Sequence, residues 1–237
     1  NTWRDHYKKI KPVPAKVLKD SPLFENVFEE GNIDLFKFPT PRWHERDGGR
    51  YIGTGSIDIT ADRDEGWTNW GTYRVMVHDS DTVGFYISPG KHGRQHRDKW
   101  FARGEPMPVV MAFGLDPTLF LSGCTEIPYG LCEYDWVGGV KGEPVEVIRG
   151  PVTGLPLPAN AEIVIEGYVH PETQLAEGPF GEWTGYYGSL EREEPVVEVK
   201  ALYHRNNPIL LGSPPSKPPD EHSFFRGFMR AANIQEQ

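Results

Sequence analysis

Short strand-like segments separated by turn signals constrain the fold of this chain more than any other feature. Several of them alternate apolar and polar residues, as "VVEVKAL" at 196–202 does, and a period of two is typical of a half-buried strand. Pro-Gly at 89–90 and Asn-Asn-Pro at 206–208 mark turns between them. The predicted strands cover residues 51–60, 72–79, 82–88, 108–114, 145–150, 161–169 and 195–204.

Helical signals are few. Asp116-Pro117 combines a capping residue with a proline at the first helical position, and predicts a helix through "TLFLSGC". A second helix is expected from about Pro219. Many strands with few helices favour an α+β fold built on a mostly antiparallel, barrel-like sheet over a doubly wound parallel sheet. The sequence has no G-x-G-x-x-G or P-loop string, which removes the usual support for dinucleotide or nucleoside-triphosphate binding.

The charge balance argues against one class of partner. With 34 acidic and 25 basic residues, the net charge is -9, whereas nonspecific nucleic-acid binding needs a basic surface. No apolar run is long enough to cross a membrane and no signal peptide is recognisable, so a cytoplasmic protein is expected. Cys124 and Cys132 are the only cysteines, too few for a disulfide scaffold.

The string "EGPFGEWTGYYG" at 177–188 carries two acids, Glu177 and Glu182, five positions apart. This is not the spacing of one helical face, and Gly-Pro-Phe-Gly would not sustain a helix. We expect a rigid turn that places both carboxylates among the aromatic side chains of the string, a setting that can tune acid–base chemistry. A pair of solvated loop acids is the alternative interpretation.

Asn69 and Arg74 flank a glycine-containing turn in "DEGWTNWGTYR" (64–74). A guanidinium on a strand beside such a turn is suited to a bidentate grip on a carboxylate. An ordinary surface arginine is the alternative.

His92 and His96 stand four positions apart in "SPGKHGRQHRDKW" (88–100). Gly90 and Gly93, with the proline before them, favour a loop over a helix. No glutamate follows His92, so the string is not the H-E-x-x-H zinc pattern. One histidine is therefore the better candidate for a metal ligand, and His96, among basic residues, is expected to be exposed.

Glu133 has apolar neighbours and follows a Pro-Tyr-Gly turn in "SGCTEIPYGLCEYDWVGG" (122–139). An acid in such a place is paired with a cation or bound to a metal, because burying it alone is costly. Asn69, His92 and Glu133 together offer an amide oxygen, an imidazole and a carboxylate. This set suits Mn²⁺ or Mg²⁺ better than structural zinc.

Taken together, these strings resemble the UbiD family of (de)carboxylases, which use prenylated flavin mononucleotide (prenylated FMN). "NWGTYR", "KHGRQH", "PYGLCEYDWVGG" and "EGPFGEWTGYYG" occur in the order of the family and with similar gaps. The resemblance runs from about "PRWHERDGGRYIGTGSIDIT" to "NNPILLGSPPSKPPDEH". It implies a split β-barrel flavin-binding domain with flanking helices.

The resemblance also implies site residues. A catalytic network over the flavin would consist of Arg74, Glu177 and Glu182. The metal ligands would be Asn69, His92 and Glu133, with Mn²⁺ bridging to the cofactor phosphate, and K⁺ would bind near main-chain oxygens of residues 122–125. Residues implied at the cofactor are Thr54, Gly71, Thr72 and Lys91, and those implied at the substrate pocket are Trp183 and His222.

The implied activity is reversible, non-oxidative decarboxylation of a small aromatic or α,β-unsaturated carboxylic acid, with release of CO₂. Arg74 would hold the carboxylate, Glu182 would donate the proton, and Glu177 would orient Arg74. A flavin prenyltransferase would supply the cofactor, and a homo-oligomer is expected.

Three alternatives stay open. A split-barrel module could bind ordinary FMN without decarboxylase activity, although it has no need of two acids around one arginine. A metal-dependent hydrolase could use His92, His96 and Glu133. A degenerate relative, or an assembly subunit of a larger carboxylase, would keep the fold without the reaction.

Three parts of the chain are expected. Residues 1–45 are punctuated by prolines and would form an N-terminal extension or the remnant of an N-terminal lobe, and residues 46–215 would form the flavin-binding domain. The amphipathic end "EHSFFRGFMRAANIQEQ" has no partner helix in the sequence. Residues 216–237 would therefore begin a linker helix to a C-terminal lobe that the chain lacks.

Overall fold

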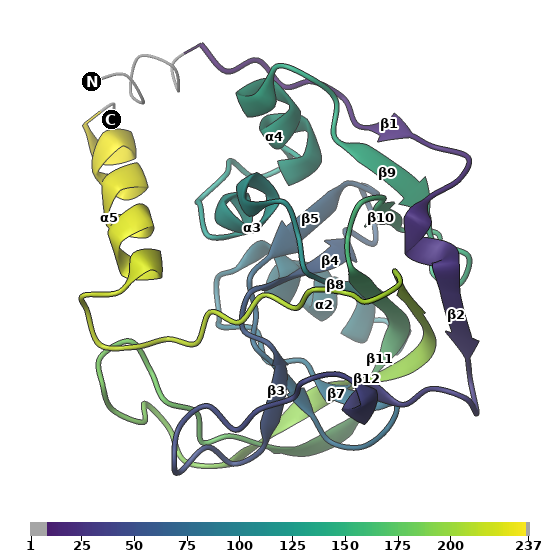
Figure 1. The fold of residues 1–237 in the computed structure, drawn as a ribbon, viewed down its shortest axis with the longest axis vertical. Coiled ribbons are helices and arrows are strands. Elements are labelled where there is room, and N and C mark those ends of the chain that lie inside the picture. The colour runs from purple at the N-terminus through teal and green to yellow at the C-terminus, as the bar shows by residue number, and fades with distance from the viewer. Residues whose placement is uncertain (1–8, 236–237) are drawn as a thin grey trace.

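The computed structural model of the protein describes residues 9–235, and its centre is one curled antiparallel sheet (Figure 1). Eight strands follow one another across it, and β2 (Asn26–Glu29) pairs with the long strand β12. The strand order is β3 (Arg50–Gly53), β6 (Val75–Val77), β7 (Thr82–Gly84), β12 (Arg192–His204), β11 (Ile163–Glu177), β8 (Met107–Phe113), β4 (Ser56–Ala61) and β5 (Thr68–Gly71). The expected mostly antiparallel architecture with flanking helices is confirmed.

A small second sheet involves the N-terminal part of the chain. Its order is β1 (Lys16–Val17), β9 (Glu146–Arg149) and β10 (Pro156–Pro158), with β1 parallel to β9. Two short 3₁₀ helices, η1 (Pro22–Glu25) and η2 (Leu35–Lys37), lead along the main sheet.

The sequence predicted one strand over residues 51–60, but the structure has two. The chain turns at Thr54 and Gly55 between β3 and β4, which are the first and the seventh of the eight strands in the order. A Cβ at Gly55 would lie 2.6 Å from Cγ of Leu211, so the turn is closely covered by the segment after β12. The strand-like pattern was therefore correct, while the glycine turn inside it was missed.

Four helices flank the sheet in the described part of the chain: α2 (His92–Phe101), α3 (Pro117–Gly123), α4 (Glu133–Lys141) and α5 (Glu221–Ile234). The predicted start of α3 is confirmed, because the Asp116 carboxylate accepts a hydrogen bond from the Thr118 amide at 2.7 Å. The predicted C-terminal helix is confirmed as α5.

The expectation of a loop over residues 88–100 was wrong, since α2 begins at His92. Gly93 lies inside this helix because of a close approach: a Cβ there would lie 2.9 Å from the Tyr73 hydroxyl. The pattern also failed to indicate α4, which contains two glycines. Cβ atoms at Gly138 and Gly139 would lie 2.5 and 2.3 Å from main-chain oxygens of residues 13 and 11, so the glycines admit the N-terminal segment.

Both faces of the central strands are buried. On β4, Ile57 and Ile59 pack in one apolar cluster with residues of α3 and α4, and Val110 of β8 joins them. Val109 and Met111 of β8 belong to the second cluster, on the other face. The sheet is held by apolar clusters on both of its faces. The helices α2 and α3 and the chain before α5 pack on this sheet.

The long segment after β12 crosses the molecule to α5, which stands on the side of α3 and α4 (Figure 1). Met229 packs against the cluster beneath those helices, and Ala232 is buried. None of the helices in residues 9–235 has the length and apolar character needed to cross a bilayer.

Candidate active site

One cavity of about 630 Å³ gathers the residues singled out from the sequence. Its walls come from the β3–β4 turn, β5 and the chain after it, the start of α2, the loop between α3 and α4, the turn after β11, and α5. Eleven of the twelve expected site residues line it: Thr54, Asn69, Gly71, Thr72, Arg74, Lys91, His92, Glu133, Glu182, Trp183 and His222. The twelfth, Glu177, is buried directly behind Arg74.

Arg74 is held between the two acids of the turn. Its Nε and Nη2 lie 2.8 Å from Oε1 and Oε2 of Glu177, and its Nη1 lies 3.1 Å from Oε1 of Glu182. Burial alone would lower the pKa of Arg74, but the hydrogen bonds and charge of Glu177 outweigh it and raise the pKa. The guanidinium carbon also lies 5.2 Å from the centre of the Phe180 ring. This arginine is therefore permanently charged and fixed at the cavity wall.

The turn that carries the acids is held by a loop that sequence reasoning missed. The Asp47 carboxylate accepts a hydrogen bond from the Gly181 amide at 2.9 Å, and the Gly48 amide donates to the Pro179 carbonyl at 2.8 Å. A Cβ at Gly48 would lie 1.8 Å from the Gly178 carbonyl oxygen, so only glycine fits. The signal in the sequence is the turn-forming string Asp-Gly-Gly at 47–49.

The expectation that aromatic side chains enclose both acids was only half right. Phe180 is buried, but Trp183 and Tyr186 are 59% and 75% exposed. Glu177 is buried, whereas the side chain of Glu182 is 35% exposed. The turn presents Glu182 to an open cavity in the described part of the chain.

Asn69 and Glu133 meet inside the cavity. The Asn69 amide nitrogen donates to Oε1 of Glu133 at 2.5 Å, and the Trp70 main-chain amide donates to Oε2 at 2.9 Å. Burial raises the pKa of Glu133 to about 7, although these hydrogen bonds lower it. The Asn69 amide oxygen is buried and has no hydrogen-bond partner among the residues described. A carboxylate that is costly to ionise and an oxygen without a donor together suit a bound cation.

His92, the third expected metal ligand, lies at the start of α2 and is packed between aromatic rings. Its ring centre is 5.6 Å from that of Trp67 and 5.5 Å from that of Tyr129. Burial, and to a lesser degree the charge of Lys91, lower the pKa of His92, so the neutral imidazole needed for a ligand is favoured. Within residues 9–235, no three side chains of the His, Cys, Asp and Glu types form a metal cluster; this candidate set contains an asparagine.

His96 was expected to be exposed, and this was wrong. It is fully buried one turn further along α2, where its Nδ1 lies 2.9 Å from the Thr60 hydroxyl and its Nε2 lies 3.8 Å from the Asp62 carboxylate. Burial lowers its pKa to about 4. His96 does not line the cavity. In the helix His92 and His96 lie on the same face, and both rings pack against Trp67, with ring centres 5.6 and 4.7 Å away.

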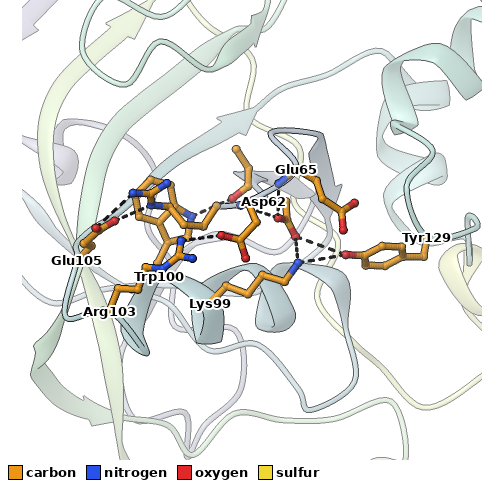
Figure 2. Close-up of polar contacts among 10 residues, drawn as sticks. Asp62, Glu65, Lys99, Trp100, Arg103, Glu105 and Tyr129 are labelled. Carbon is orange, nitrogen blue, oxygen red and sulfur yellow. Dashed lines mark hydrogen bonds and ion pairs between the residues drawn. The ribbon is translucent and has the colours of Figure 1, made fainter.

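A polar network around Asp62, Lys99 and Tyr129 fastens α2, as Figure 2 shows. Lys99 donates to the Asp62 carboxylate at 2.6 Å, and the same carboxylate accepts the main-chain amide of Glu65 at 2.9 Å. The Tyr129 hydroxyl lies 3.5 Å from this carboxylate and 3.4 Å from Lys99, while the Tyr129 ring packs on His92. Although burial opposes them, these hydrogen bonds lower the pKa of Asp62 to about 2. The network thus fixes the wall behind His92.

Three contacts tie Thr54, Thr72 and His222 into the wall of the cavity. Thr54 accepts a hydrogen bond from the Ser213 amide at 3.0 Å, and the Thr72 hydroxyl donates to the Gly123 carbonyl at 3.3 Å. Nε2 of His222, from α5, lies 3.3 Å from Sγ of Cys124. The β3–β4 turn, the α3–α4 loop and α5 therefore share one polar rim.

The chain is similar to known proteins along most of its length. Residues 15–218 match the family model described as UbiD, the 3-octaprenyl-4-hydroxybenzoate carboxy-lyase Rift-related domain. Pyrrole-2-carboxylic acid decarboxylase of Pseudomonas aeruginosa is 36% identical over 226 residues, which are 95% of this chain and 46% of the relative. Ferulic acid decarboxylase 1 of Candida dubliniensis is 35% identical over 224 residues, 92% of this chain and 44% of the relative.

A solved structure agrees with these relatives. The UbiD-class enzyme HmfF from Pelotomaculum thermopropionicum, in an evolved dimeric form in complex with prFMN, has a TM-score of 0.90 and 32% identity. The likeness covers 98% of this chain and 55% of that chain. This chain thus spans about half the length of the curated relatives that it matches. With the fold, the order of the motifs and the family match in agreement, this chain belongs to the UbiD family.

Proposed function

We propose that the protein containing this chain is a prenylated-FMN-dependent enzyme that reversibly decarboxylates an aromatic or α,β-unsaturated carboxylic acid. The observation that carries the proposal is Arg74, held between Glu177 and Glu182 at the wall of a cavity shared with Asn69, His92 and Glu133. Relatives that are named decarboxylases, and the prFMN complex of HmfF, support the reaction class and the cofactor.

Arg74 would bind the carboxylate of the substrate. Glu177 occupies two of its donors, so the guanidinium plane is fixed before substrate arrives and little entropy is lost on binding. Glu182 has a single contact to Arg74 and is partly exposed to the cavity, so it would donate the proton that replaces CO₂ on the substrate carbon. When bound, the prenylated flavin would supply the electron sink for breaking the carbon–carboxylate bond.

The residues present fit the metal and cofactor that the family implies. Asn69, with its unpartnered buried oxygen, would hold Mn²⁺ together with His92 and Glu133, and a nearby divalent charge would stabilise the ionised form of the buried Glu133 carboxylate. Thr54, Gly71, Thr72 and Lys91 would contact the flavin. Main-chain oxygens of residues 122–125 would bind K⁺. A flavin prenyltransferase would supply the cofactor, and the enzyme would assemble as a homo-oligomer.

The test uses the intact protein, co-expressed with a flavin prenyltransferase and purified with Mn²⁺ and K⁺. The mass of the released cofactor and the visible spectrum would identify prenylated FMN, and CO₂ release from aromatic and cinnamic-type acids would establish the reaction. Arg74→Ala should abolish turnover with cofactor still bound. Plain FMN without turnover in the wild type would favour an FMN-binding module instead.

The metal assignment has its own test. His92→Ala should lower the manganese content of the purified protein and weaken flavin binding together. Unchanged manganese in this variant would move the metal to other residues. A hydrolase that uses His96 is disfavoured, because His96 is buried away from the cavity.

A further inference from the structure

The acids around Arg74 outnumber its single positive charge. The guanidinium contacts Glu177 through Nε and Nη2 and Glu182 through Nη1, and a bound substrate would bring a third carboxylate. The proton that Glu182 carries as the proposed donor removes one excess negative charge, and the other needs a further positive group. The Tyr51 hydroxyl donates to Glu177 at 3.4 Å, but a phenol carries no positive charge in either of its forms.

His78 faces Glu177 from the strand that follows Arg74. Side chains alternate along a strand, so Arg74, Met76 and His78, in and beside β6, share one face. Gly84 of the neighbouring strand β7 has no side chain, which leaves space next to this face. A Cβ at Gly84 would lie 3.4 Å from Cγ of Glu177 and 3.5 Å from Nε2 of His78. The two side chains therefore border the same small space.

The imidazole of His78 connects this space with solvent. Its Nε2 is buried and has no hydrogen-bond partner among the residues that the structure describes. The residue as a whole is half-buried and lines a second cavity of about 350 Å³, together with Phe36 and Arg50. A proton from solvent can thus reach the ring, and once there its charge lies beside Glu177.

The charged groups near His78 have both signs. Burial has the largest effect and lowers the pKa of His78, while the adjacent Asp79 and Glu177 raise it. Arg50 of β3 lines the same second cavity, and Arg192, which lies opposite Glu177 in the β11–β12 pairing, is bound at 2.9 Å to an acid of its own strand. His78 is therefore neutral near pH 7, and its proton affinity depends on how far Arg74 compensates the charge of Glu177.

We propose that binding of a carboxylate at Arg74 takes up a proton at His78, which then supplies the missing positive charge to Glu177. The inference rests on the proposed function, which assigns the substrate carboxylate to Arg74. As Arg74 shares its charge with the substrate, Glu177 is less compensated, and the imidazole beside it becomes a stronger base. Once the carboxylate has left as CO₂, Arg74 again serves the two acids alone and the proton returns to solvent. His78 is thus a positioning residue that acts through Glu177.

Calorimetric titration of the intact protein with benzoate measures the proton uptake. Titrations at pH 6.5 in Pipes and in Bis-Tris, whose heats of ionisation differ, give the number of protons taken up per bound carboxylate. His78→Gln should take up less than the wild type by about half a proton, whereas Glu182→Gln should keep this share. The control is His170→Gln, a histidine that lines neither cavity and pairs with Glu198, and it should match the wild type.

An NMR titration of the His78 ring gives a readout that does not need the His78 variant to fold. Saturating benzoate should raise the proton affinity of this ring in the wild type about ten-fold, the effect of one uncompensated charge at this range. A titration curve of His78 that benzoate does not move would overturn the proposal. Proton uptake that persists in His78→Gln and disappears in Glu182→Gln would assign it to the proton donor and overturn the proposal as well.

The proposed function and this inference can fail separately. Benzoate affinity that Arg74→Ala leaves unchanged would refute the carboxylate assignment and, with it, the linkage to His78. Benzoate affinity that is lost in Arg74→Ala, without proton uptake at His78 in the wild type, would overturn the inference alone. A wild type that takes up the proton at His78 but releases no CO₂ from aromatic or cinnamic-type acids would refute the proposed function and leave the inference standing.

Discussion

Arg74 and Glu177 form a two-point ion pair, with both nitrogen–oxygen distances at 2.8 Å and only 1% of the Glu177 side chain exposed. Glu182 has one contact to the same arginine, at 3.1 Å, and its side chain is 35% exposed. Two acids that look equivalent in the sequence thus occupy different physical situations. Glu177 is a fixed partner of the arginine, and Glu182 keeps access to the cavity.

The difference predicts unequal effects on stability. Glu177→Gln should lower the free energy of unfolding by about 3 kcal/mol, because it breaks a buried ion pair and leaves Arg74 without its main counter-charge. Glu182→Gln should cost less than about 1 kcal/mol, since its partly exposed pair is screened by water. Urea unfolding of both variants measures the contrast. Equal losses would show that Glu182 is held as firmly as Glu177, which would weaken its assignment as the proton donor.

The antiparallel sheet was predictable because its strands have a local sequence pattern. The alternation in "VVEVKAL" marks β12, and Asp116-Pro117 marks the start of α3, and both signals depend on residues next to one another. The helices α2 and α4 were not predictable in the same way. In the sequence, the glycines of these two helices are typical of turns. In the structure they make room for tertiary contacts: Tyr73 packs against Gly93, and the N-terminal segment packs against Gly138.

In the candidate site too, some residues could be predicted from local sequence and others could not. Its cavity-lining residues were found because they lie in compact strings that resemble a family, and the fold brings those strings together. The residues that hold them are scattered. Asp47 reaches Gly181 across 134 positions, and Lys99 reaches Asp62 across 37, so no local pattern connects them. Supporting contacts of this kind follow only from the folded chain.

Acid should destabilise the protein through His96. Its pKa is lowered by burial from 6.5 to about 4 in the folded state, so between these values the unfolded chain binds a proton that the folded chain does not. Stability is therefore lost as the pH falls from 6.5 toward 4, by up to about 3 kcal/mol from this group. Other acids titrate nearby, so the measurement is the difference between the wild type and His96→Gln in urea unfolding at pH 7, 6, 5 and 4. A constant difference across this range would contradict the prediction.

The lysine of the α2 network should matter for both stability and metal binding. Lys99→Met removes the 2.6 Å contact to the buried Asp62 carboxylate and should lower the unfolding temperature. Because the network supports Tyr129 and through it His92, Mn²⁺ affinity should also fall by about ten-fold. Lys99→Arg should restore much of both.

The matched control for Lys99 is Arg63→Met in the neighbouring pair with Glu105, whose side chains are 35% and 38% exposed. It should change the unfolding temperature less than Lys99→Met does and leave Mn²⁺ binding unchanged. Thermal unfolding and metal titration of the three variants distinguish a network that positions His92 from a generally sensitive surface. Loss of stability without loss of metal affinity in Lys99→Met would limit the network to a structural role.

Gly48 should be the most sensitive position outside the cavity. A Cβ there would lie 1.8 Å from the Gly178 carbonyl oxygen, a main-chain atom that no side-chain rotation can move. Gly48→Ala must therefore displace the loop, the Gly48–Pro179 hydrogen bond and the turn that carries both acids, and should cost more than about 3 kcal/mol.

Gly31→Ala provides the control, because Gly31 has a φ of +86° but open space around it. It should cost only about 1 kcal/mol, the penalty of a left-handed backbone for alanine. Chemical denaturation compares the two, and turnover per folded molecule shows whether the acids have moved. Gly48→Ala should lose turnover beyond its loss of folded protein, whereas Gly31→Ala should not. Full specific activity in folded Gly48→Ala would mean that the Asp47–Gly48 loop supports the fold but does not set the positions of Glu177 and Glu182.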